Sequence, residues 1–244
     1  MSCELHVARK AFGRLLVIDD LRLSIPPGSF TALVGPSGAG KSTLLNIISG
    51  LDTDFEGEMS WSDGVRGRVG YMFQEPRLMP WLSARANIEL VLEGDRADPA
   101  RVERMLERVG LAGRGDAYPG QLSGGMQRRV ALARAMAIEP DLLLLDEPFS
   151  SLDEPTAQGL RRLTLGLCRE QGNAVLLVTH NLSEALALAD RVLFLSRGPA
   201  RIVHLEELGG SVGGELRDPA LVMKDLLARH PEILSGVATI EGAL

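Results

Sequence analysis

One glycine-rich segment of the 244-residue chain combines residue types that bind phosphate. It reads Gly35-Pro-Ser-Gly-Ala-Gly-Lys-Ser42, with four residues between Gly35 and Gly40. Glycines at this spacing let backbone N–H groups converge on phosphate oxygens, and the N-terminus of a following helix adds positive potential. Lys41 would then reach the β- and γ-phosphates, and the Ser42 hydroxyl would ligate Mg²⁺. The segment predicts a nucleoside triphosphate site, but by itself it does not distinguish a kinase from a GTPase or an ATPase.

Two further motifs could complete such a site. The apolar run Leu142–Leu145 is followed by Asp146 and Glu147. Adjacent side chains on a strand point in different directions, so Asp146 can orient the Mg²⁺ shell while Glu147 faces the γ-phosphate and polarises water. The segment Leu122-Ser-Gly-Gly-Met-Gln127 places another Ser-Gly-Gly at a predicted helix N-terminus. It therefore predicts a second anion site in the same chain.

The composition excludes several classes of protein. With 45% apolar residues, 24% charged residues and a net charge of −6, the chain is expected to be globular and neither disordered nor fibrous. No apolar run approaches the roughly 20 residues that cross a bilayer. The acidic balance argues against nucleic acid as the main partner, and Cys3 and Cys168 predict neither a disulfide framework nor a metal cluster. Of the 26 basic residues only Lys10, Lys41 and Lys224 are lysines.

A particular set of strands and helices must position the motifs. The alternating segment Leu21–Ile25 and the apolar segment Ser29–Val34 predict a hairpin-like pair of strands joined by a Pro26-Pro27-Gly28 turn. The phosphate loop would then connect the second strand to a helix, as its mechanism requires. From Asp141 onwards, continuous apolar strands alternate with helices, which is typical of a parallel sheet covered on both faces. Strands are expected at about 68–73, 142–145, 174–179 and 191–195, and helices at about 44–49, 98–109, 123–136, 156–169 and 182–188.

The phosphate loop, the Ser-Gly-Gly-Met-Gln segment and the Leu-Leu-Leu-Leu-Asp-Glu segment follow one another along the chain in this order. Together they resemble the nucleotide-binding ATPase subunits of ABC transporters, and the resemblance runs from about residue 5 to 205. It implies an α/β fold, a P-loop NTPase with a RecA-like parallel-sheet core, an N-terminal antiparallel β subdomain and an α-helical subdomain inserted at about 83–137. It also implies a nucleotide-binding domain over residues 1–206, followed by a short C-terminal extension over 207–244. The implied cofactors are ATP and Mg²⁺.

The same resemblance assigns roles to further residues. Gln74 looks like the family's Q-loop glutamine, which contacts the Mg²⁺ and the attacking water and senses the permease. His180 resembles the switch histidine at the γ-phosphate, Ser150-Ser-Leu-Asp153 resembles the D-loop at the dimer interface, and Phe12 falls where an aromatic ring stacks on adenine. The implied catalytic residues are Glu147, His180, Gln74 and Lys41; the implied metal ligands are Ser42, Gln74 and Asp146; the implied ATP contacts within one chain are Phe12, Gly35, Pro36, Ser37, Gly38, Ala39, Gly40, Lys41, Ser42 and Thr43.

A head-to-tail homodimer is expected from the motifs and from the resemblance. Each chain has one phosphate loop and one Ser-Gly-Gly helix, so a twofold axis could place Ser123 and Gly125 of one chain against the nucleotide of the other. The resemblance adds Gly124 and Asp153 to the residues that the opposite subunit supplies, and two ATP molecules are then sandwiched between the chains. ATP would hold the dimer closed and hydrolysis would release it, which is the expected basis of transport coupling.

The segment after Gln74 indicates a group of importers. It reads Glu75-Pro-Arg-Leu-Met-Pro80-Trp81 and, together with Met126, resembles the importers of nitrate, sulfonates, taurine and thiamine precursors. This resemblance implies integral-membrane permease subunits docking near Gln74 to Trp81, a solute-binding protein as an indirect partner, and a peripheral location on the cytoplasmic face of the bacterial inner or plasma membrane. Trp81 would either anchor that interface or pack inside the helical subdomain. Asn181 departs from the group, which usually has Asp after the switch histidine.

Two other functions share part of this pattern. A phosphotransferase also has the phosphate loop, but it needs an acceptor pocket and lid arginines, and it needs neither the Ser-Gly-Gly-Met-Gln segment nor His180. An ABC-type ATPase of DNA repair or regulation carries the same motifs with long coiled coils between them, whereas Leu122 lies only 82 positions after Gly40 here. The presence of Glu147 argues against a regulator that only binds nucleotide.

Overall fold

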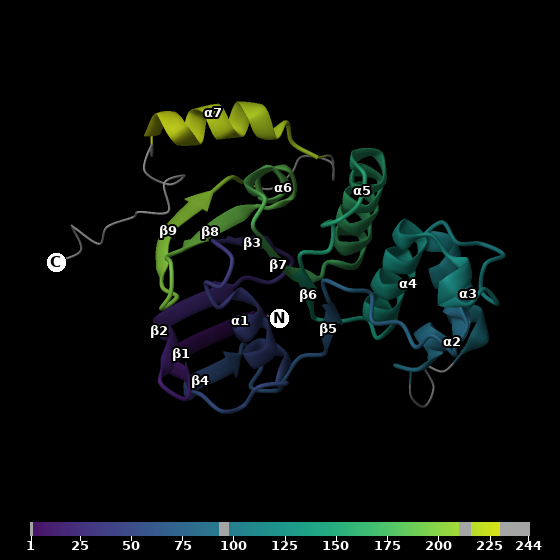
Figure 1. Cartoon of the computed structure of the whole chain (residues 1–244), viewed down its shortest axis with the longest axis horizontal. Helices are drawn as coiled ribbons and strands as arrows, with labels where there is room; N and C mark the ends of the chain where they lie inside the picture. The colour runs from purple at the N-terminus through teal and green to yellow at the C-terminus, as the bar shows by residue number, and fades with distance from the viewer. Residues whose placement is uncertain (1, 93–97, 210–215, 230–244) are drawn as a thin grey trace. The chain divides into compact units, whose positions relative to one another are not determined.

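The computed structural model of the chain describes residues 2–92, 98–209 and 216–229. The protein divides into two compact units, the first made of Met1–Arg66 with Ala174–Leu244 and the second of Gly67–Asn173 (Figure 1). Residues 210–215 and 230–244 of the predicted C-terminal extension lie outside the described residues. Within the described ranges, no helix has the length and apolar character needed to cross a membrane.

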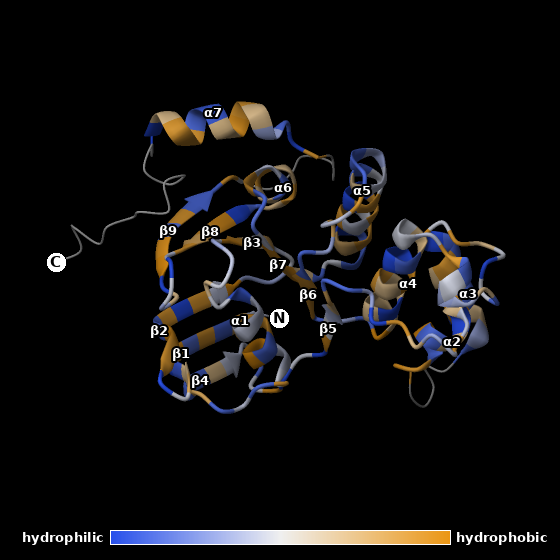
Figure 2. Cartoon of the chain, in the orientation of Figure 1, coloured by the Kyte–Doolittle hydropathy of each residue, from blue (hydrophilic) through white to orange (hydrophobic). Residues whose placement is uncertain are grey.

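The first unit contains an antiparallel sheet of the strands β1 (Cys3–Phe12), β2 (Leu15–Ile25) and β4 (Glu56–Trp61), in the order β2-β1-β4. Buried and exposed residues alternate along most of β1 and the end of β2, and both strands carry alternating hydrophobic and hydrophilic bands (Figure 2). This alternation requires a sheet with one buried side and one side in water, and an antiparallel sheet can have that arrangement. The antiparallel β subdomain expected at the N-terminus is present.

The first unit also contains three parallel strands that are buried almost throughout, in the order β7 (Ala174–Thr179), β3 (Phe30–Val34) and β8 (Arg191–Leu195). β9 (Ile202–Glu207) pairs with β8 in the antiparallel direction, and only Glu206 of this strand is buried. The helices of this unit are α1 (Lys41–Ser49), α6 (Leu182–Leu188) and α7 (Pro219–Arg229), and α7 packs on α6. Helix α1 ends where Gly50 takes a left-handed conformation, which is common for a glycine that follows a helix.

The predicted hairpin of Leu21–Ile25 with Ser29–Val34 is wrong. β2 pairs with β1, and β3 pairs in parallel with β7 and β8. The reason lies in burial: Phe30–Leu33 is buried on both faces, which suits a central parallel strand, whereas the alternating residues of β2 suit a sheet with one exposed face. The turn at Pro26-Pro27-Gly28 therefore carries the chain from one sheet to another.

The second unit pairs two parallel strands, β5 (Val69–Met72) and β6 (Leu142–Asp146). Its helices are α2 (Ala84–Glu89), α3 (Pro99–Arg108), α4 (Gly124–Ala137) and α5 (Glu154–Gln171), with a short 3-10 turn at Pro119–Gln121. Asp98, Ser123 and Asp153 cap the helices α3, α4 and α5 through side-chain oxygens, as expected for these residue types at helix N-termini. The helical stretch predicted at about 83–137 corresponds to α2, α3 and α4.

Candidate active site

The phosphate loop lies between β3 and α1 and has a backbone that requires glycine. Gly40 caps α1 with φ +89°, and a Cβ there would lie 3.0 Å from Cγ1 of Val17. A Cβ at Gly35 would lie 2.9 Å from the Cβ of Leu195. The first turn of α1 holds no acidic residue, so no carboxylate there offsets the positive end of the helix dipole.

Lys41 is the first residue of α1 and folds back over the loop. Its ammonium donates hydrogen bonds of 2.8 Å to the carbonyl oxygens of Gly35 and Pro36. The residue is only 6% exposed, whereas Ser42 is exposed. A compact cation and a hydroxyl are therefore held at the helix N-terminus, where phosphate binds in loops of this kind.

His180 lies at the same sheet edge as the loop. Val34 pairs with Thr179 across the parallel strands β3 and β7, so the loop and His180 leave the sheet at the same level. The Thr179 hydroxyl donates to Glu184 and accepts from the backbone N–H of Asn181, both at 2.9 Å. Asn181 caps α6. Asparagine caps a helix as well as aspartate does, so this cap stays intact although the importer group usually has Asp at this position. This turn holds the backbone around the exposed His180.

Phe12 ends β1 and is 53% exposed. The register between β1 and β2 shifts after Lys10, where Val17 is the extra residue on β2. Val17 is the residue whose side chain approaches Gly40. The bulge thus brings the end of the antiparallel sheet close to the phosphate loop, as bulges near functional sites often do.

In the second unit, the carboxyl ends of β5 and β6 hold the other polar residues. Met72 pairs with Leu145, so Gln74 and Glu147 each follow the last pair by two residues. Asp146 is 8% exposed and accepts a long hydrogen bond of 3.5 Å from the hydroxyl of Tyr71. Burial, and then the charge of Asp146, raises the pKa of Tyr71 well above its ordinary value, so the phenol remains a donor.

Glu147 has a strained backbone. Its φ is +44°, a left-handed conformation that is rare for a residue with a side chain. Its carbonyl oxygen accepts hydrogen bonds from the backbone N–H of Ser150 at 3.2 Å and from the Ser150 hydroxyl at 2.9 Å. Left-handed residues of this kind cost about 1–3 kcal/mol and persist only where their surroundings hold them.

Arg128 on α4, which the sequence does not single out, supplies that support. Its guanidinium donates to the carbonyl oxygens of Gln74 at 2.9 Å, Pro148 at 2.8 Å and Ser150 at 2.6 Å. Burial lowers the pKa of Arg128 from its ordinary value, but an arginine stays charged at neutral pH. One cation therefore ties the segment after β5 to the turn that follows Glu147. The sequence shows a basic residue directly after the Ser-Gly-Gly-Met-Gln segment, but it does not show which backbone carbonyls the side chain of that residue contacts.

The Ser-Gly-Gly segment forms the start of α4. The hydroxyl oxygen of Ser123 accepts from the backbone N–H of Met126 at 3.3 Å. A Cβ at Gly125 would lie 2.6 Å from Cγ2 of Thr156, whereas nothing lies within 4 Å of one at Gly124. Asp153 caps α5 by accepting from the backbone and hydroxyl of Thr156, and the hydroxyl bond lowers the pKa of Asp153.

The predicted site residues thus fall into two groups. Phe12, Gly35–Thr43 and His180 belong to the first unit, and Gln74, Ser123, Gly124, Gly125, Asp146, Glu147 and Asp153 belong to the second. Each unit gathers part of its set at the carboxyl end of parallel strands, where ligands bind in open α/β sheets.

Comparison with known proteins decides the family. A sequence profile of the ABC transporter family matches residues 18–150, which span the phosphate loop, the Ser-Gly-Gly segment and the acidic pair. The chain belongs to the ABC transporter family. It therefore binds and hydrolyses ATP to power a membrane transporter, and its α/β P-loop NTPase fold is confirmed. The phosphotransferase and DNA-repair alternatives are set aside.

Individual members of this ABC family are similar over most of the chain. The aliphatic sulfonates import ATP-binding protein SsuB 1 of Xanthomonas axonopodis pv. citri is 46% identical, covering 84% of this chain and 85% of the relative. Its counterpart SsuB 2 of Paracoccus denitrificans is 49% identical, covering 86% and 83% respectively. Among solved structures, a dimeric post-hydrolysis state of the ATP-binding cassette MJ0796 bound to ADP and Pi matches with a TM-score of 0.73 at 31% identity, covering 86% of this chain and all of that one.

Proposed function

We propose that this chain is the ATP-hydrolysing subunit of an importer for aliphatic sulfonates. The observation that carries the proposal is 44–49% identity to import ATP-binding proteins for aliphatic sulfonates, over 84–90% of the chain. The Leu-Met-Pro-Trp segment before Leu82 supports the same importer group. The solute itself would be selected by the permease and the solute-binding protein, in line with the resemblance to that group.

ATP would bind with its phosphates on residues 35–43. Backbone N–H groups of the loop and the ammonium of Lys41 would bind the β- and γ-phosphates, and His180 would contact the γ-phosphate from the same sheet edge. The aromatic ring of Phe12 would stack on adenine. These roles are supported by the left-handed Gly40, by the buried Lys41 and by the pairing of Val34 with Thr179.

Ser42, Gln74 and Asp146 would hold Mg²⁺. Hydroxyl, amide and carboxylate oxygens are the ligands that Mg²⁺ prefers, and it commonly uses one or two carboxylates together with substrate phosphates. Among the described residues there is no group of three or more His, Cys, Asp or Glu that could hold a metal on its own, which fits a site completed by ATP. Bound Mg²⁺ would neutralise charge on the phosphates. Tyr71 would keep the Asp146 carboxylate oriented through its hydroxyl.

Glu147 would act as general base for the attacking water, and Gln74 would orient that water. Arg128 would keep both backbone segments in place through its three carbonyl partners. Two chains would then form a head-to-tail homodimer, in which Ser123, Gly124, Gly125 and Asp153 of one chain face the nucleotide of the other. The exposed N-terminus of α4 supports this role, since Ser123 and Gly124 are both open to solvent.

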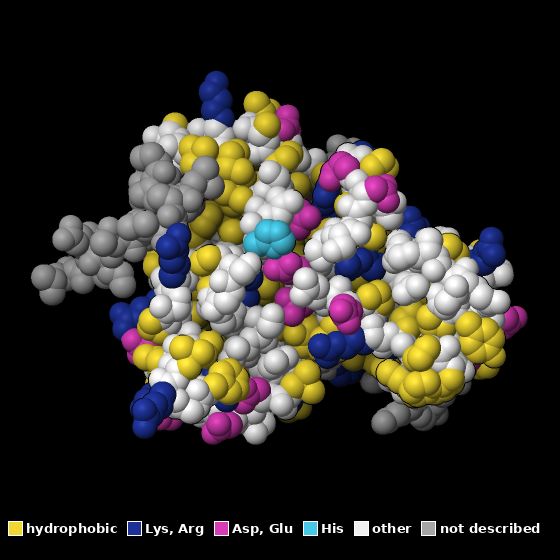
Figure 3. Space-filling model, in the orientation of Figure 1, with side chains coloured by type: hydrophobic (Ala, Val, Ile, Leu, Met, Phe, Trp, Pro, Cys, Tyr) yellow, Lys and Arg dark blue, Asp and Glu magenta, His cyan; other side chains and the backbone are white. Residues whose placement is uncertain are grey.

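The permease would dock near Gln74 to Trp81, on the cytoplasmic face of the membrane. Trp81 is 70% exposed, so it does not pack inside the helical segment. Buried Asn87 bonds the backbone N–H of Met79 at 2.8 Å and the carbonyls of Met79, Leu82 and Ser83 at 3.0–3.2 Å, so it fixes the loop that presents Trp81. Hydrophobic side chains gather on the face of the helical part around α2 and α3 (Figure 3).

The test uses the complex purified from membranes with its permease and reconstituted in vesicles. Binding protein loaded with an alkanesulfonate should stimulate ATP hydrolysis several-fold, while nitrate or a pyrimidine should not. The Glu147→Gln complex should bind ATP, form the closed dimer and hydrolyse nothing. Stimulation by another solute alone would overturn the sulfonate assignment, and normal hydrolysis by the Glu147→Gln complex would overturn the role of Glu147.

A further inference from the structure

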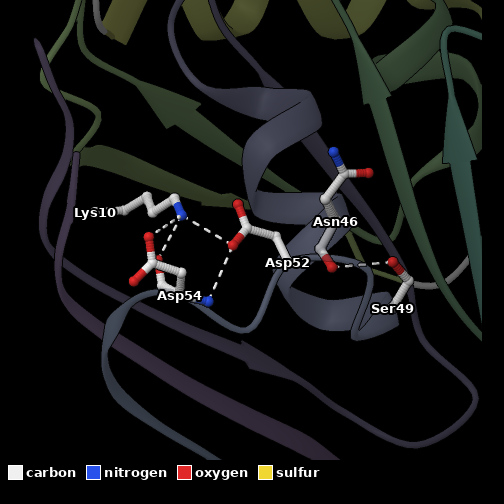
Figure 4. A network of polar contacts seen from close by, with 5 residues as sticks. All are labelled: Lys10, Asn46, Ser49, Asp52 and Asp54. Atoms are coloured by element: carbon white, nitrogen blue, oxygen red, sulfur yellow. Dashed lines mark hydrogen bonds and ion pairs between the residues drawn. The ribbon is translucent and has the colours of Figure 1, made fainter. Parts of the chain in front are cut away.

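Lys10 is a buried lysine on β1, in a chain that has only three lysines. It is 2% exposed, and its ammonium lies 2.8 Å from a carboxylate oxygen of Asp52 and 3.6 Å from one of Asp54. The same ammonium donates to the backbone carbonyl of Asp54 (Figure 4). The Asp52 side chain is 18% exposed and that of Asp54 is 98% exposed, so the pairs are only partly buried, and ion pairs with exposed partners contribute little to stability. The charge at this position therefore invites an explanation other than stability.

The ammonium has one more neighbour, the ring of Phe12. The Nζ atom of Lys10 lies 4.6 Å from the ring centroid, within the range of a cation–π contact. Phe12 is 53% exposed while Lys10 is buried, so the cation covers the inner side of the ring. The outer side of the ring is left for another flat group.

Lys10 is also anchored to the helix that carries the phosphate loop. The carbonyl of Asn46, near the end of α1, accepts from the backbone N–H groups of Leu51 and Asp52 at 2.9 and 3.1 Å and from the Ser49 hydroxyl at 3.1 Å. This turn fixes Asp52, which holds Lys10 (Figure 4). The aromatic end of β1 is thus tied to the C-terminal end of α1, while Lys41 stands at its N-terminal end.

We propose that Lys10 is a positioning residue for the nucleotide base, acting through Phe12. Its ammonium fixes the ring and withdraws electron density from the inner face, so that the outer face stacks on the electron-rich purine. The proposal rests on the role given to Phe12 above. The phenylalanine ring has no hydroxyl through which a hydrogen bond could hold it, so the ammonium of Lys10 supplies that support instead.

The test measures the dissociation constants of the full chain for Mg²⁺-ATP and for Mg²⁺-tripolyphosphate, which has the phosphates but no base. Lys10→Met should weaken ATP binding about three- to tenfold and leave tripolyphosphate binding within about twofold. Phe12→Ala should weaken ATP binding about tenfold, and adding Lys10→Met to it should cause no further loss. Arg9→Met removes a charge from the exposed neighbouring position and should change neither constant.

Lys10→Gln keeps a donor for Asp52 without the charge, so it carries the same expectation if Lys10→Met does not fold. Equal losses for ATP and tripolyphosphate would overturn the proposal, because Lys10 would then act on the loop or the fold. A further loss in the Phe12→Ala background would also overturn it. If Phe12→Ala leaves ATP affinity unchanged, the role of Phe12 itself fails; if only Lys10→Met does so, Phe12 stands and the inference about Lys10 falls.

Discussion

Replacing Arg128 by methionine removes three hydrogen bonds that converge on one guanidinium. Hydrogen bonds to charged groups contribute about 1.5–3 kcal/mol each, and they are not additive. The partners of Arg128 are neutral carbonyls, and leaving a buried carbonyl without its donor costs about 1–3 kcal/mol of unfolding free energy. We expect a loss near the lower end for Arg128→Met, because methionine fills part of the volume.

The effect on turnover should exceed what stability predicts. Without Arg128, the carbonyls of Pro148 and Ser150 lose their donor, and the left-handed turn at Glu147 can relax. A misplacement of about 1 Å can lower a rate about 100-fold. We therefore expect kcat for ATP hydrolysis to fall about 100-fold, while the dissociation constant for ATP stays within about twofold, since the phosphate loop belongs to the other unit.

The assay is phosphate release at saturating ATP, together with equilibrium binding of ATP, on protein shown to be folded by circular dichroism. Arg129→Met is the matched control, because Arg129 lies on the same helix and donates to the carbonyl of Val109 at 2.9 Å. It should retain turnover. A folded Arg128→Met variant with kcat within threefold of the parent would refute the reasoning, and so would a parallel loss of ATP affinity.

Three further outcomes are expected. Gly125→Ala should lower the free energy of unfolding by about 1–3 kcal/mol, because its Cβ would meet the Thr156 side chain at 2.6 Å, whereas Gly124→Ala should not lower it in the same urea titration. Trp81→Ala should leave the ATP turnover of the isolated chain unchanged and reduce its stimulation by the permease; unchanged stimulation would contradict the docking site. Burial raises the pKa of Cys168 from 9.0 to about 12. The thiol therefore ionises more easily in the unfolded chain, so the stability contributed by the buried neutral thiol is complete below pH 9 and is lost as the pH rises toward 12. The fall in the urea midpoint between pH 8 and pH 10.5 should therefore be smaller for Cys168→Ala.

Sequence alone predicted the strands that precede the phosphate loop, Gln74, Glu147 and His180, whereas the roles of Gln74 and His180 came from the resemblance to ABC ATPases. The structure then brings His180 and the phosphate loop to one sheet edge, because Val34 pairs with Thr179 across parallel strands. The same reasoning applies to Gln74 and Glu147 beyond the pair of Met72 with Leu145. The starts of α3 and α4 were predicted from Asp98 and Ser123, whose side chains bond free N–H groups of the first turn, whereas α1 begins at Lys41 and α5 at Glu154, before their predicted starts.

Sequence did not predict contacts made through the backbone. The partners of Arg128 are all carbonyl oxygens, which every residue possesses, so no pairing of residue types marks them. The left-handed φ of Glu147 was equally hidden, since residue type argues against it. The hairpin error had a similar origin: adjacent strands in sequence usually pair, and only burial on both faces of β3 assigns it to a different sheet.

Ser123 and Asp153 both cap helices, yet their chemistry suits them to different neighbours across a dimer. A hydroxyl accepts and donates at once, so Ser123 can accept from Met126 and still donate its hydrogen to a phosphate oxygen. The ionised Asp153 only accepts, and its bonds to Thr156 lower its pKa and keep it ionised. A phosphate would repel that carboxylate, whereas a ribose hydroxyl would donate to it. We therefore expect Ser123 to contact the triphosphate and Asp153 to approach the nucleotide only at a donor group.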